Sequence, residues 1–198
     1  MAIKAFFQKS LDAGDVIPLV SLDVQGAFDS ALWPGFLREL TECRCAKNLY
    51  ELTKSYFKKR SAALATNSLR TEKTLSRGCP QGSCCGPGSW NLQFNSLLEL
   101  QFMARTKVVA FADDLIMATR EDSVRAAENY AGVELNNIDG WARKNKIRFN
   151  DKKTKVMLVT RRKRREDKDI TLYFNFKPLE QVTQMKYLGI ILDQKFRF

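Results

Sequence analysis

The sequence predicts an α+β fold in which an antiparallel sheet carries helices packed on one face. Segments with strand or helix periodicity follow one another in the order strand, helices, hairpin, helix, hairpin, helix, strand. Hairpins inserted between helices favour a β-α-β-β arrangement, in which the first strand lies beside the central hairpin. The length of 198 residues and the 44% content of hydrophobic residues suit one domain with a packed core.

The first part of the chain is predicted to form a helix, a strand, two more helices and a hairpin. A short helix covers residues 2–13, and a buried strand covers residues 16–24, where Pro18 indicates an edge strand or an early strand position. Residues 61–76 are expected to form a hairpin that turns near Asn67. Apolar residues at helical spacing indicate two amphipathic helices that are separated near Cys43–Cys45. These apolar residues are Trp33, Phe36, Leu37 and Leu40 in the first helix and Leu49, Leu52 and Tyr56 in the second.

A loop over residues 77–88 is the densest Gly/Pro stretch of the chain, and it is expected to be a shaped loop between two strong elements. Ser89 is expected to cap the next helix, and a further helix is predicted over residues 121–144, followed by a strand over 156–160. The helix after the loop has one apolar face, made of Trp90, Phe94, Leu97 and Leu98.

The C-terminal part is predicted to hold two strands, over residues 170–176 and 186–192, joined around Lys177-Pro178. The basic run Arg161–Arg165 precedes them and is expected to be a solvated loop. A nuclear localisation signal and a phosphate contact are the alternative interpretations of this run.

Two apolar runs, residues 108–112 and 115–119, flank the adjacent acids Asp113 and Asp114. This pattern predicts two buried strands joined by a tight turn at the acids. Neighbouring carboxylates repel one another and burial opposes their ionisation, so a divalent cation would relieve both penalties. A solvated turn is the simpler alternative, because Asp is a common turn residue. Asp23, at the end of the first strand, is expected to meet the pair.

Composition limits the class of partner and the compartment. The formal charge of +11 and the pI of about 9.6 suit a polyanion, most simply nucleic acid, with an anionic membrane surface as the lesser alternative. The five cysteines are odd in number and form no CxxC pair, which favours a reducing compartment, nuclear or cytoplasmic, over a disulfide framework or a structural zinc site. No apolar run is long enough to span a membrane, and the N-terminus has too short an apolar core for a secretion signal.

The chemistry open to this chain is narrowed by the complete absence of histidine. Ser-His-Asp and Cys-His catalysis are excluded, so carboxylates, metal, lysine or backbone must carry any reaction. Three converging carboxylates suit two-metal phosphoryl transfer, in which two Mg²⁺ ions about 4 Å apart hold the attacking and leaving oxygens in line.

Five stretches of the sequence stand out together, namely Leu22–Asp29 (LDVQGAFD), Gly78–Ser83 (GCPQGS), Phe111–Asp114 (FADD), Phe149–Lys155 (FNDKKTK) and Lys186–Ile190 (KYLGI). With these stretches in the family's order, the chain resembles the reverse transcriptase domain of non-LTR retrotransposons over about residues 15–192. The resemblance implies a polymerase palm, which is a ferredoxin-like antiparallel sheet with helices on one face. It also implies that residues 1–198 are a palm-like domain, with the fingers largely missing upstream and the thumb missing after about residue 192.

The resemblance also implies the metal ligands. Asp23 and Asp113 would bind the ions, the backbone carbonyl of Val24 would assist them, and Asp114 would support the pair. Two Mg²⁺ ions are expected, with Mn²⁺ as the alternative ion.

A second group of residues is implied to contact the incoming nucleotide. Phe28 would lie beneath the sugar and exclude a 2′-hydroxyl, although an ordinary core Phe is the alternative. Gln81 would contact the nucleotide, and the backbone of Val24 belongs to the same set. Gly78 and Gly82 would let the backbone approach the template and primer closely, with a plain Gly/Pro turn as the alternative.

The lysine motif is implied to face the triphosphate. Lys153 would act as the general acid that protonates the leaving pyrophosphate. A solvated lysine is the alternative, and Lys152 and Lys155 are rivals for the role. The residues implied to place the primer end, with simple core packing as the alternative, are Tyr187, Leu188 and Gly189.

The function implied is RNA-directed DNA polymerisation in retrotransposition, with an RNA template, a DNA primer and deoxynucleoside triphosphates as partners, and no membrane. The alternative is a catalytically inactive or repurposed fragment that only binds nucleic acid. A nucleotide cyclase shares a palm-like sheet with two metal-binding acids, but the Pro-Gln-Gly loop and the lysine motif argue against it.

Overall fold

The computed structural model describes residues 2–79, 82–162 and 169–196, and the chain divides into two compact units. The first unit comprises Met1–Gln25, Leu97–Lys144 and Arg148–Phe198, and the second comprises Gly26–Ser96 and Asn145–Ile147. In sequence, most of the second unit is therefore a single insertion within the first.

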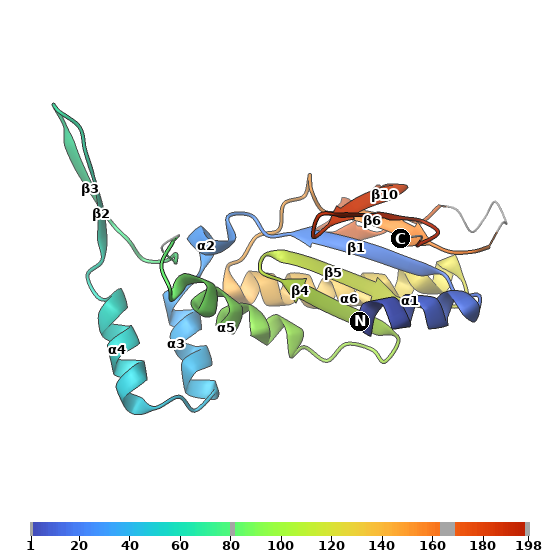
Figure 1. Ribbon diagram of the computed structural model, residues 1–198, viewed down its shortest axis with the longest axis horizontal. Coiled ribbons are helices and arrows are strands. Elements are labelled where there is room, and N and C mark those ends of the chain that lie inside the picture. The colour runs from blue at the N-terminus through green and yellow to red at the C-terminus, as the bar shows by residue number, and fades with distance from the viewer. Residues whose placement is uncertain (1, 80–81, 163–168, 197–198) are drawn as a thin grey trace. The chain divides into compact units, whose positions relative to one another are not determined.

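A five-stranded sheet forms the centre of the first unit (Figure 1). Its strands, in spatial order, are β4 (Thr106–Phe111), β5 (Asp114–Thr119), β1 (Ile17–Asp23), β6 (Lys155–Val159) and β9 (Glu180–Gln181). β1 pairs antiparallel with β5 and β6, β4 pairs antiparallel with β5, and β9 runs parallel to β6. The predicted α+β class is confirmed. Because β1 is a central strand, Pro18 marks an early strand position and not an edge.

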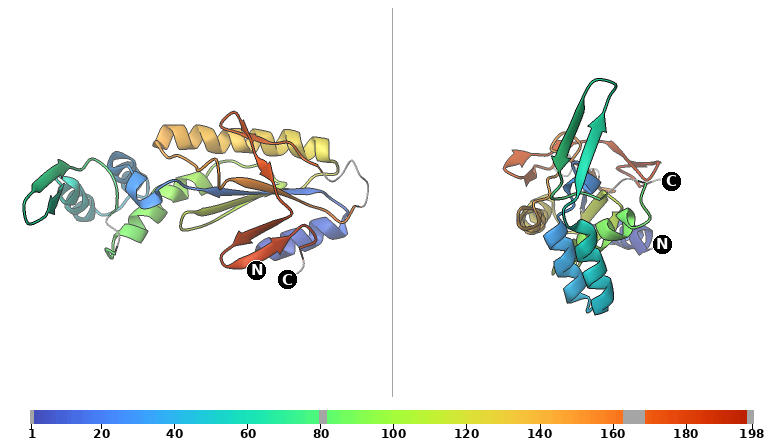
Figure 2. Two further views of the ribbon diagram at one scale, coloured as in Figure 1. Left: turned by 90° about the horizontal axis from the view of Figure 1, so that it is seen from above. Right: turned by 90° about the vertical axis from the view of Figure 1, so that its left-hand side faces the viewer.

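Both faces of this sheet are covered (Figure 2). Helix α6 (Val124–Asn145) lies along one face, and helix α1 (Ala2–Asp12) lies on the other with the hairpin of β10 (Gln184–Tyr187) and β11 (Ile190–Asp193). The central strands β1 and β6 are apolar on both faces, so a second cover is required besides the predicted helical one. The residues that α6 buries at helical spacing are Ala127, Ala131, Leu135, Ile138 and Ala142.

One apolar cluster joins α1 and the β10–β11 hairpin to the central strands. Its buried members are Phe7, Leu11, Ile17, Leu19, Ile116, Ala118, Met157, Val159, Met185 and Leu192. Successive side chains of a strand point to opposite faces, so these alternate residues identify the strand faces that α1 and the hairpin cover.

The C-terminal part is more broken than the sequence predicts. The segment expected at 170–176 contributes only β7 (Tyr173–Phe174), and Lys177–Pro178, expected as a connection, forms its partner strand β8. The strand expected at 186–192 is interrupted, because Leu188 and Gly189 have φ values of 49° and 81° and form the turn between β10 and β11.

The second unit begins with three helices and a hairpin. The helices are α2 (Ala27–Ser30), α3 (Trp33–Glu42) and α4 (Lys47–Phe57), and the hairpin consists of β2 (Ser61–Ala65) and β3 (Arg70–Thr74). Helices α3 and α4 and the hairpin lie where apolar spacing and turn residues predict them, whereas α2 forms where the sequence predicts only a turn after the first strand. The rings of Trp33 and Phe57 stack with centroids 5.0 Å apart and fasten α3 to α4.

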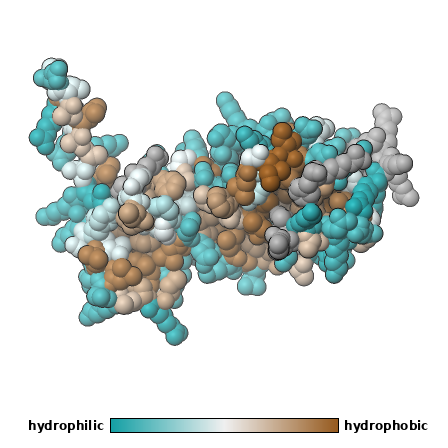
Figure 3. Space-filling model, in the orientation of Figure 1, coloured by the Kyte–Doolittle hydropathy of each residue, from teal (hydrophilic) through white to brown (hydrophobic). Residues whose placement is uncertain are grey.

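The apolar residues of α4 are not buried as an amphipathic helix predicts. Leu52 is 67% exposed, and Leu49 and Tyr56 are also exposed. Every residue of β2 and β3 is exposed as well. Apolar side chains consequently gather on the surface over α3 and α4, and a second apolar patch lies over the β10–β11 hairpin (Figure 3).

Helix α5 (Gly86–Leu98) begins three residues before the predicted cap. The hydroxyl of Ser89 lies inside the helix and donates to the carbonyl of Cys85 at 2.8 Å. The hydroxyl of Ser83 instead accepts a hydrogen bond from the Gly86 amide at 3.0 Å, and so takes the capping role. On the predicted apolar face, Leu98 is exposed, whereas the other three residues are buried.

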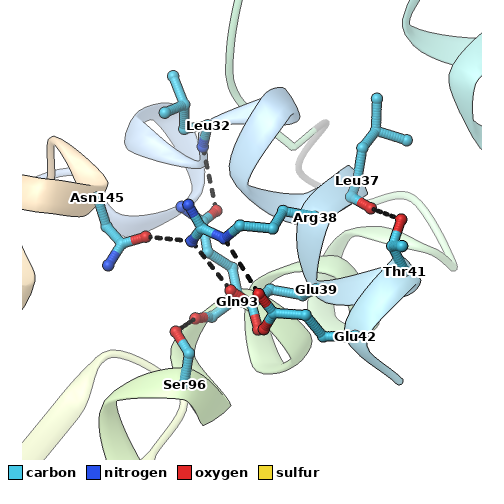
Figure 4. Close-up of polar contacts among 9 residues, drawn as sticks. All are labelled: Leu32, Leu37, Arg38, Glu39, Thr41, Glu42, Gln93, Ser96 and Asn145. Atoms are coloured by element: carbon cyan, nitrogen blue, oxygen red, sulfur yellow. Dashed lines mark hydrogen bonds and ion pairs between the residues drawn. The ribbon is translucent and has the colours of Figure 1, made fainter. Parts of the chain in front are cut away.

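A polar network ties α3 to other parts of the second unit (Figure 4). The Arg38 guanidinium donates to Glu39 Oε1 and to Asn145 Oδ1, both at 3.0 Å. Gln93 of α5 accepts a hydrogen bond from the Leu32 amide at 3.1 Å, just before α3 begins. These bonds hold the start and the middle of α3.

Three compositional expectations can be compared with the structure. All five cysteines are free, as expected. Arg161 donates to Asp12 at 2.6 Å and Arg162 donates to the carbonyl of Gly14 at 2.8 Å, so the start of the basic run is held at the end of α1. The remainder, Lys163–Arg165, lies outside the described residues. Within the described ranges, no helix is both long enough and apolar enough to cross a bilayer.

Leu135 tests the packing of α6, because it is fully buried whereas Val133 on the same helix is 46% exposed. Leu135→Ala should lower the free energy of unfolding by about 2–5 kcal/mol, because it removes buried methyl groups and leaves a cavity. Val133→Ala, the matched control, should change it by less than about 0.5 kcal/mol. Urea titration followed by circular dichroism measures both. Equal losses would show that α6 does not pack through this face.

Candidate active site

Two carboxylates face each other across the centre of the sheet. Asp23 is the last residue of β1, Asp114 is the first residue of β5, and the two are direct partners in the antiparallel register. Directly opposite residues have Cβ atoms about 4.5–5.5 Å apart, and like charges at such positions repel. Asp23 lies on the same face of β1 as Ile17 and Leu19, and Asp114 lies on the same face of β5 as Ile116. Both carboxylates therefore project from the face of the sheet that carries the β10–β11 hairpin.

The turn that joins β4 to β5 brings Asp113 beside this pair. Phe111 pairs with Asp114, so the two-residue loop is Ala112-Asp113, one residue earlier than the predicted turn. Ala112 has φ of 54°, a left-handed conformation that costs an L-residue roughly 1–2 kcal/mol. β4 is an edge strand with Phe111 63% exposed, so only β5 of the two predicted buried strands is buried.

The electrostatics of the site centre on Asp114. Burial raises the pKa of its carboxyl above the usual value, and the negative charges of Asp113 and Asp23 raise the pKa further. The positive charge of Lys153 opposes these effects as the smallest contribution. The fold therefore holds Asp114 in a field that disfavours its ionised form, which a cation would stabilise.

Lys153 is delivered to the site by a turn that begins at Asn150. Its ammonium lies 3.3 Å from Oδ1 of Asp23. The amide of Asn150 donates to the Asp23 carbonyl at 2.7 Å, and the carbonyl of Asn150 accepts from the amides of Lys153 and Thr154. Asn150 thus connects the end of β1 to the lysine. Asn150 was not predicted as a separate site residue and was named only within the Phe149–Lys155 stretch, although Asn followed by Asp is a turn signal.

The two rival lysines lie elsewhere. Lys155 begins β6 and pairs with Glu180 of β9 at 3.2 Å. The side chain of Lys152 is exposed, while its amide donates to Oδ1 of Asn150 at 3.1 Å. Of the three lysines, Lys153 is the one that the structure places beside an acid of the site.

Val24 follows Asp23 and forms an isolated antiparallel bridge with Phe149. The two hydrogen bonds of this bridge belong to its neighbours, from Gln25 N to Arg148 O and from Asn150 N to Asp23 O. Backbone groups of successive strand residues point to opposite sides, so the carbonyl of Val24 is directed away from Phe149, toward the β5 side. This is the side on which the β4–β5 turn lies.

Tyr187 comes to the same face from the end of β10. Its side chain packs against the apolar cluster of the sheet, and its hydroxyl is buried with no hydrogen-bond partner in the part of the chain that the structure describes. Burial raises the pKa of this hydroxyl, and the charge of Asp114 raises it further. Leu188 and Gly189 form the turn that follows, with Leu188 exposed, so only Tyr187 of the three predicted primer residues is packed against the sheet.

The other predicted residues belong to the second unit. Phe28 of α2 is half-buried, with its ring centroid 6.3 Å from that of Trp90. The carbonyl of Phe28 accepts the Cys79 amide at 2.7 Å, and a Cβ at Gly78 would lie 3.4 Å from the carbonyl of Asp29. Gly78 therefore lets the loop approach α2 closely. Gly82 has φ of 80° and open space around it, and Gln81 lies outside the described residues.

As the structure places them, the three acids do not yet form a complete set of metal ligands. Within residues 2–79, 82–162 and 169–196, no three acidic, cysteine or histidine side chains lie close enough together to enclose a metal ion as placed. What the strands bring together is a pair of opposed carboxylates with a third on the adjoining turn, all with oxygen donors of the kind that hard divalent cations prefer.

The family described as reverse transcriptase (RNA-dependent DNA polymerase) matches residues 7–192. The chain is similar to a 115 kDa protein in the type-1 retrotransposable element R1DM of Drosophila melanogaster, with 29% identity over 89% of this chain and 17% of the relative. It is also similar to the RNA-directed DNA polymerase from mobile element jockey of Drosophila funebris, with 27% identity over 89% of this chain and 20% of the relative.

Among solved structures, the fold is similar to telomerase from Candida tropicalis in complex with the TWJ fragment of telomeric RNA. The TM-score is 0.70 at 11% identity, over 98% of this chain and 31% of that chain. An apo telomerase of the same organism, truncated from its C-terminal domain, gives 0.68 at 12% identity over 97% of this chain and 37% of that chain. The likeness concerns the fold, which is that of a polymerase palm.

This chain spans about a fifth of the length of the two curated relatives named above. Because the family match extends over almost the whole chain and the relatives named above come from non-LTR retrotransposons, the chain belongs to the reverse transcriptase family, whose members are RNA-directed DNA polymerases.

Proposed function

We propose that residues 1–198 form the palm of a non-LTR reverse transcriptase, which adds deoxynucleotides to a primer 3′-hydroxyl on an RNA template and releases pyrophosphate. The observation that carries the proposal is the register pairing of Asp23 with Asp114, with Asp113 on the adjoining turn. All three acids lie within residues 7–192, which match the reverse transcriptase family. The fingers and thumb of a polymerase would come from other parts of the polyprotein.

Asp23, Asp113 and Asp114 are proposed to hold two Mg²⁺ ions, with the carbonyl of Val24 as a further ligand and Mn²⁺ as a substitute ion. The donors fit, because all are oxygens and the carboxylates repel one another when no cation is present. Reverse transcriptases generally use divalent ions, which lower the pKa of the attacking hydroxyl and neutralise the leaving phosphates. Rotation of the side chains would close the acids into a binding set.

Lys153 is proposed to exchange partners. Its ammonium compensates the charge of Asp23 at 3.3 Å. Divalent cations bound at the acids would release it toward the triphosphate, where it would protonate the leaving pyrophosphate. Its side chain is 66% exposed, so this movement breaks no packing.

The remaining site residues are proposed to select and place the substrates. Phe28 would exclude a 2′-hydroxyl from the incoming nucleotide, and Gln81 and Gly82 would lie along it. Tyr187 to Gly189 would help to place the primer end. An inactive fragment that only binds nucleic acid is the second candidate, which the charge of +11 favours equally.

Metal binding is the first test. Mn²⁺ should broaden the NMR signals of Asp23, Asp113 and Asp114, and Mg²⁺ at about 100 times its Kd should stabilise the fold by roughly 2.7 kcal/mol. Asp113→Asn should weaken both effects, because it removes a ligand charge, whereas Asp122→Asn on the exposed surface should leave them unchanged. Broadening spread evenly over all surface acids would favour the fragment that only binds nucleic acid.

The pH dependence of stability provides a second test. The folded pKa of Asp114 is raised, so this group contributes stability below its unfolded pKa of about 3.9 and loses it as pH rises through the folded pKa. When no divalent cation is added, Asp114→Asn should therefore raise the free energy of unfolding at pH 7, and the gain should shrink as pH falls through the folded pKa and be absent below about 3.9. Asp122→Asn is again the control. Urea titrations from pH 3 to pH 8 measure the difference, and a loss of stability at pH 7 would contradict the prediction.

Sugar selection tests the role of Phe28 in a polymerase that supplies fingers and thumb around this palm. Phe28→Val should raise ribonucleotide incorporation with little loss of deoxynucleotide use, because the smaller side chain leaves room for a 2′-hydroxyl. Primer extension with each nucleotide type measures the ratio, and deoxynucleotide use is the internal control. If mutant and wild type discriminate equally, Phe28 is a packing residue beside Trp90.

A further inference from the structure

The hydroxyl of Tyr187 is a buried donor. It is inaccessible to solvent and has no hydrogen-bond partner among residues 2–79, 82–162 and 169–196. Leaving a buried polar group unpaired is destabilising, and a Phe at this position would avoid that penalty. A hydroxyl kept in such a place therefore indicates a partner that another state of the protein supplies.

The packing of the β10–β11 hairpin shows which partner is within reach. Tyr187 packs against the cluster that contains Ile116 and Ala118 of β5. Asp114 precedes Ile116 by two residues, so its side chain leaves the same face of β5. Tyr187 and Asp114 therefore lie on one face of the sheet, and the negative charge of Asp114 is the second cause, after burial, that raises the pKa of the Tyr187 hydroxyl.

The Asp114 carboxylate, whose pKa is raised, is the group of the site that an uncharged hydrogen-bond donor would most help to stabilise. Lys153 pairs with Asp23, and its positive charge is the smallest of the influences on the pKa of Asp114. A further positively charged side chain beside Asp114 would compete with a divalent ion for the Asp114 carboxylate. A phenolic hydroxyl can orient one carboxylate oxygen without adding charge.

We propose that Tyr187 is a positioning residue for Asp114, whose hydroxyl donates a hydrogen bond to the Asp114 carboxylate when a divalent cation is bound. The inference rests on the proposed function, and it assigns Tyr187 a role in the metal site besides any contact with a primer. Such partners behind a metal ligand typically change metal affinity by 10-fold to 100-fold.

The test is Tyr187→Phe, which removes the hydroxyl and keeps the ring against the cluster. The Mn²⁺ affinity of the purified chain, measured by the electron paramagnetic resonance of free Mn²⁺, should fall about 10-fold or more. The urea midpoint without metal should stay equal or rise, because the variant removes an unpaired buried hydroxyl. Tyr173→Phe is the matched control, since Tyr173 is 56% exposed and should change neither value.

The two measurements separate the possible results. Unchanged Mn²⁺ affinity in Tyr187→Phe would overturn the positioning role. A lower midpoint without metal would also overturn it, because the hydroxyl would then have a structural partner in the metal-free fold. If the wild type and Asp113→Asn/Asp114→Asn bind Mn²⁺ equally, the proposed metal site itself fails, whatever Tyr187→Phe does.

Discussion

The register of β1 against β5 is the constraint on which the site depends. Leu19 opposite Ala118 and Leu22 opposite Leu115 set this register, and the same register leaves Asp23 opposite Asp114. A slip by one residue would move every side chain to the other face and bury charge in place of leucine. Apolar packing along the two strands thus holds together two carboxylates that repel each other at their ends. The acids have their geometry because the core determines it.

A second dependence follows from the central place of β1. A strand with partners on both edges can present its side chains only to the two faces, and both are covered here, by α6 and by α1 with the β10–β11 hairpin. The hairpin also carries Tyr187 to the face from which the carboxylates leave. The cover of the core and the surroundings of the acids are therefore built from the same short C-terminal segment.

The sequence predicted the parts of this arrangement that local chemistry decides. Asp23 after an apolar strand, two acids between apolar runs and helices at regular spacing all lie where periodicity indicates. The turn at Ala112-Asp113 was missed by one residue, because Ala is a poor signal for positive φ. Tertiary context decided the rest. Ser83 and not Ser89 caps α5, β4 is exposed at an edge, and the orientation of the Tyr187 hydroxyl depends on a hairpin fold that spacing does not reveal.

The second unit has a topological consequence, because Gly26–Ser96 enters the chain directly after β1 and leaves it before β4. For the pairing of β1 with β5, this segment is a connecting loop. The entropic cost of bringing the two ends of such a loop together grows only with the logarithm of its length. Doubling a loop costs only about 0.6 kcal/mol, so helices and hairpins can be added or lost there while the opposed carboxylates stay paired. The pairing of Asp23 with Asp114 thereby tolerates changes of length in this segment, whereas the contacts proposed for Phe28, Gln81 and Gly82 require the segment to return to the same place.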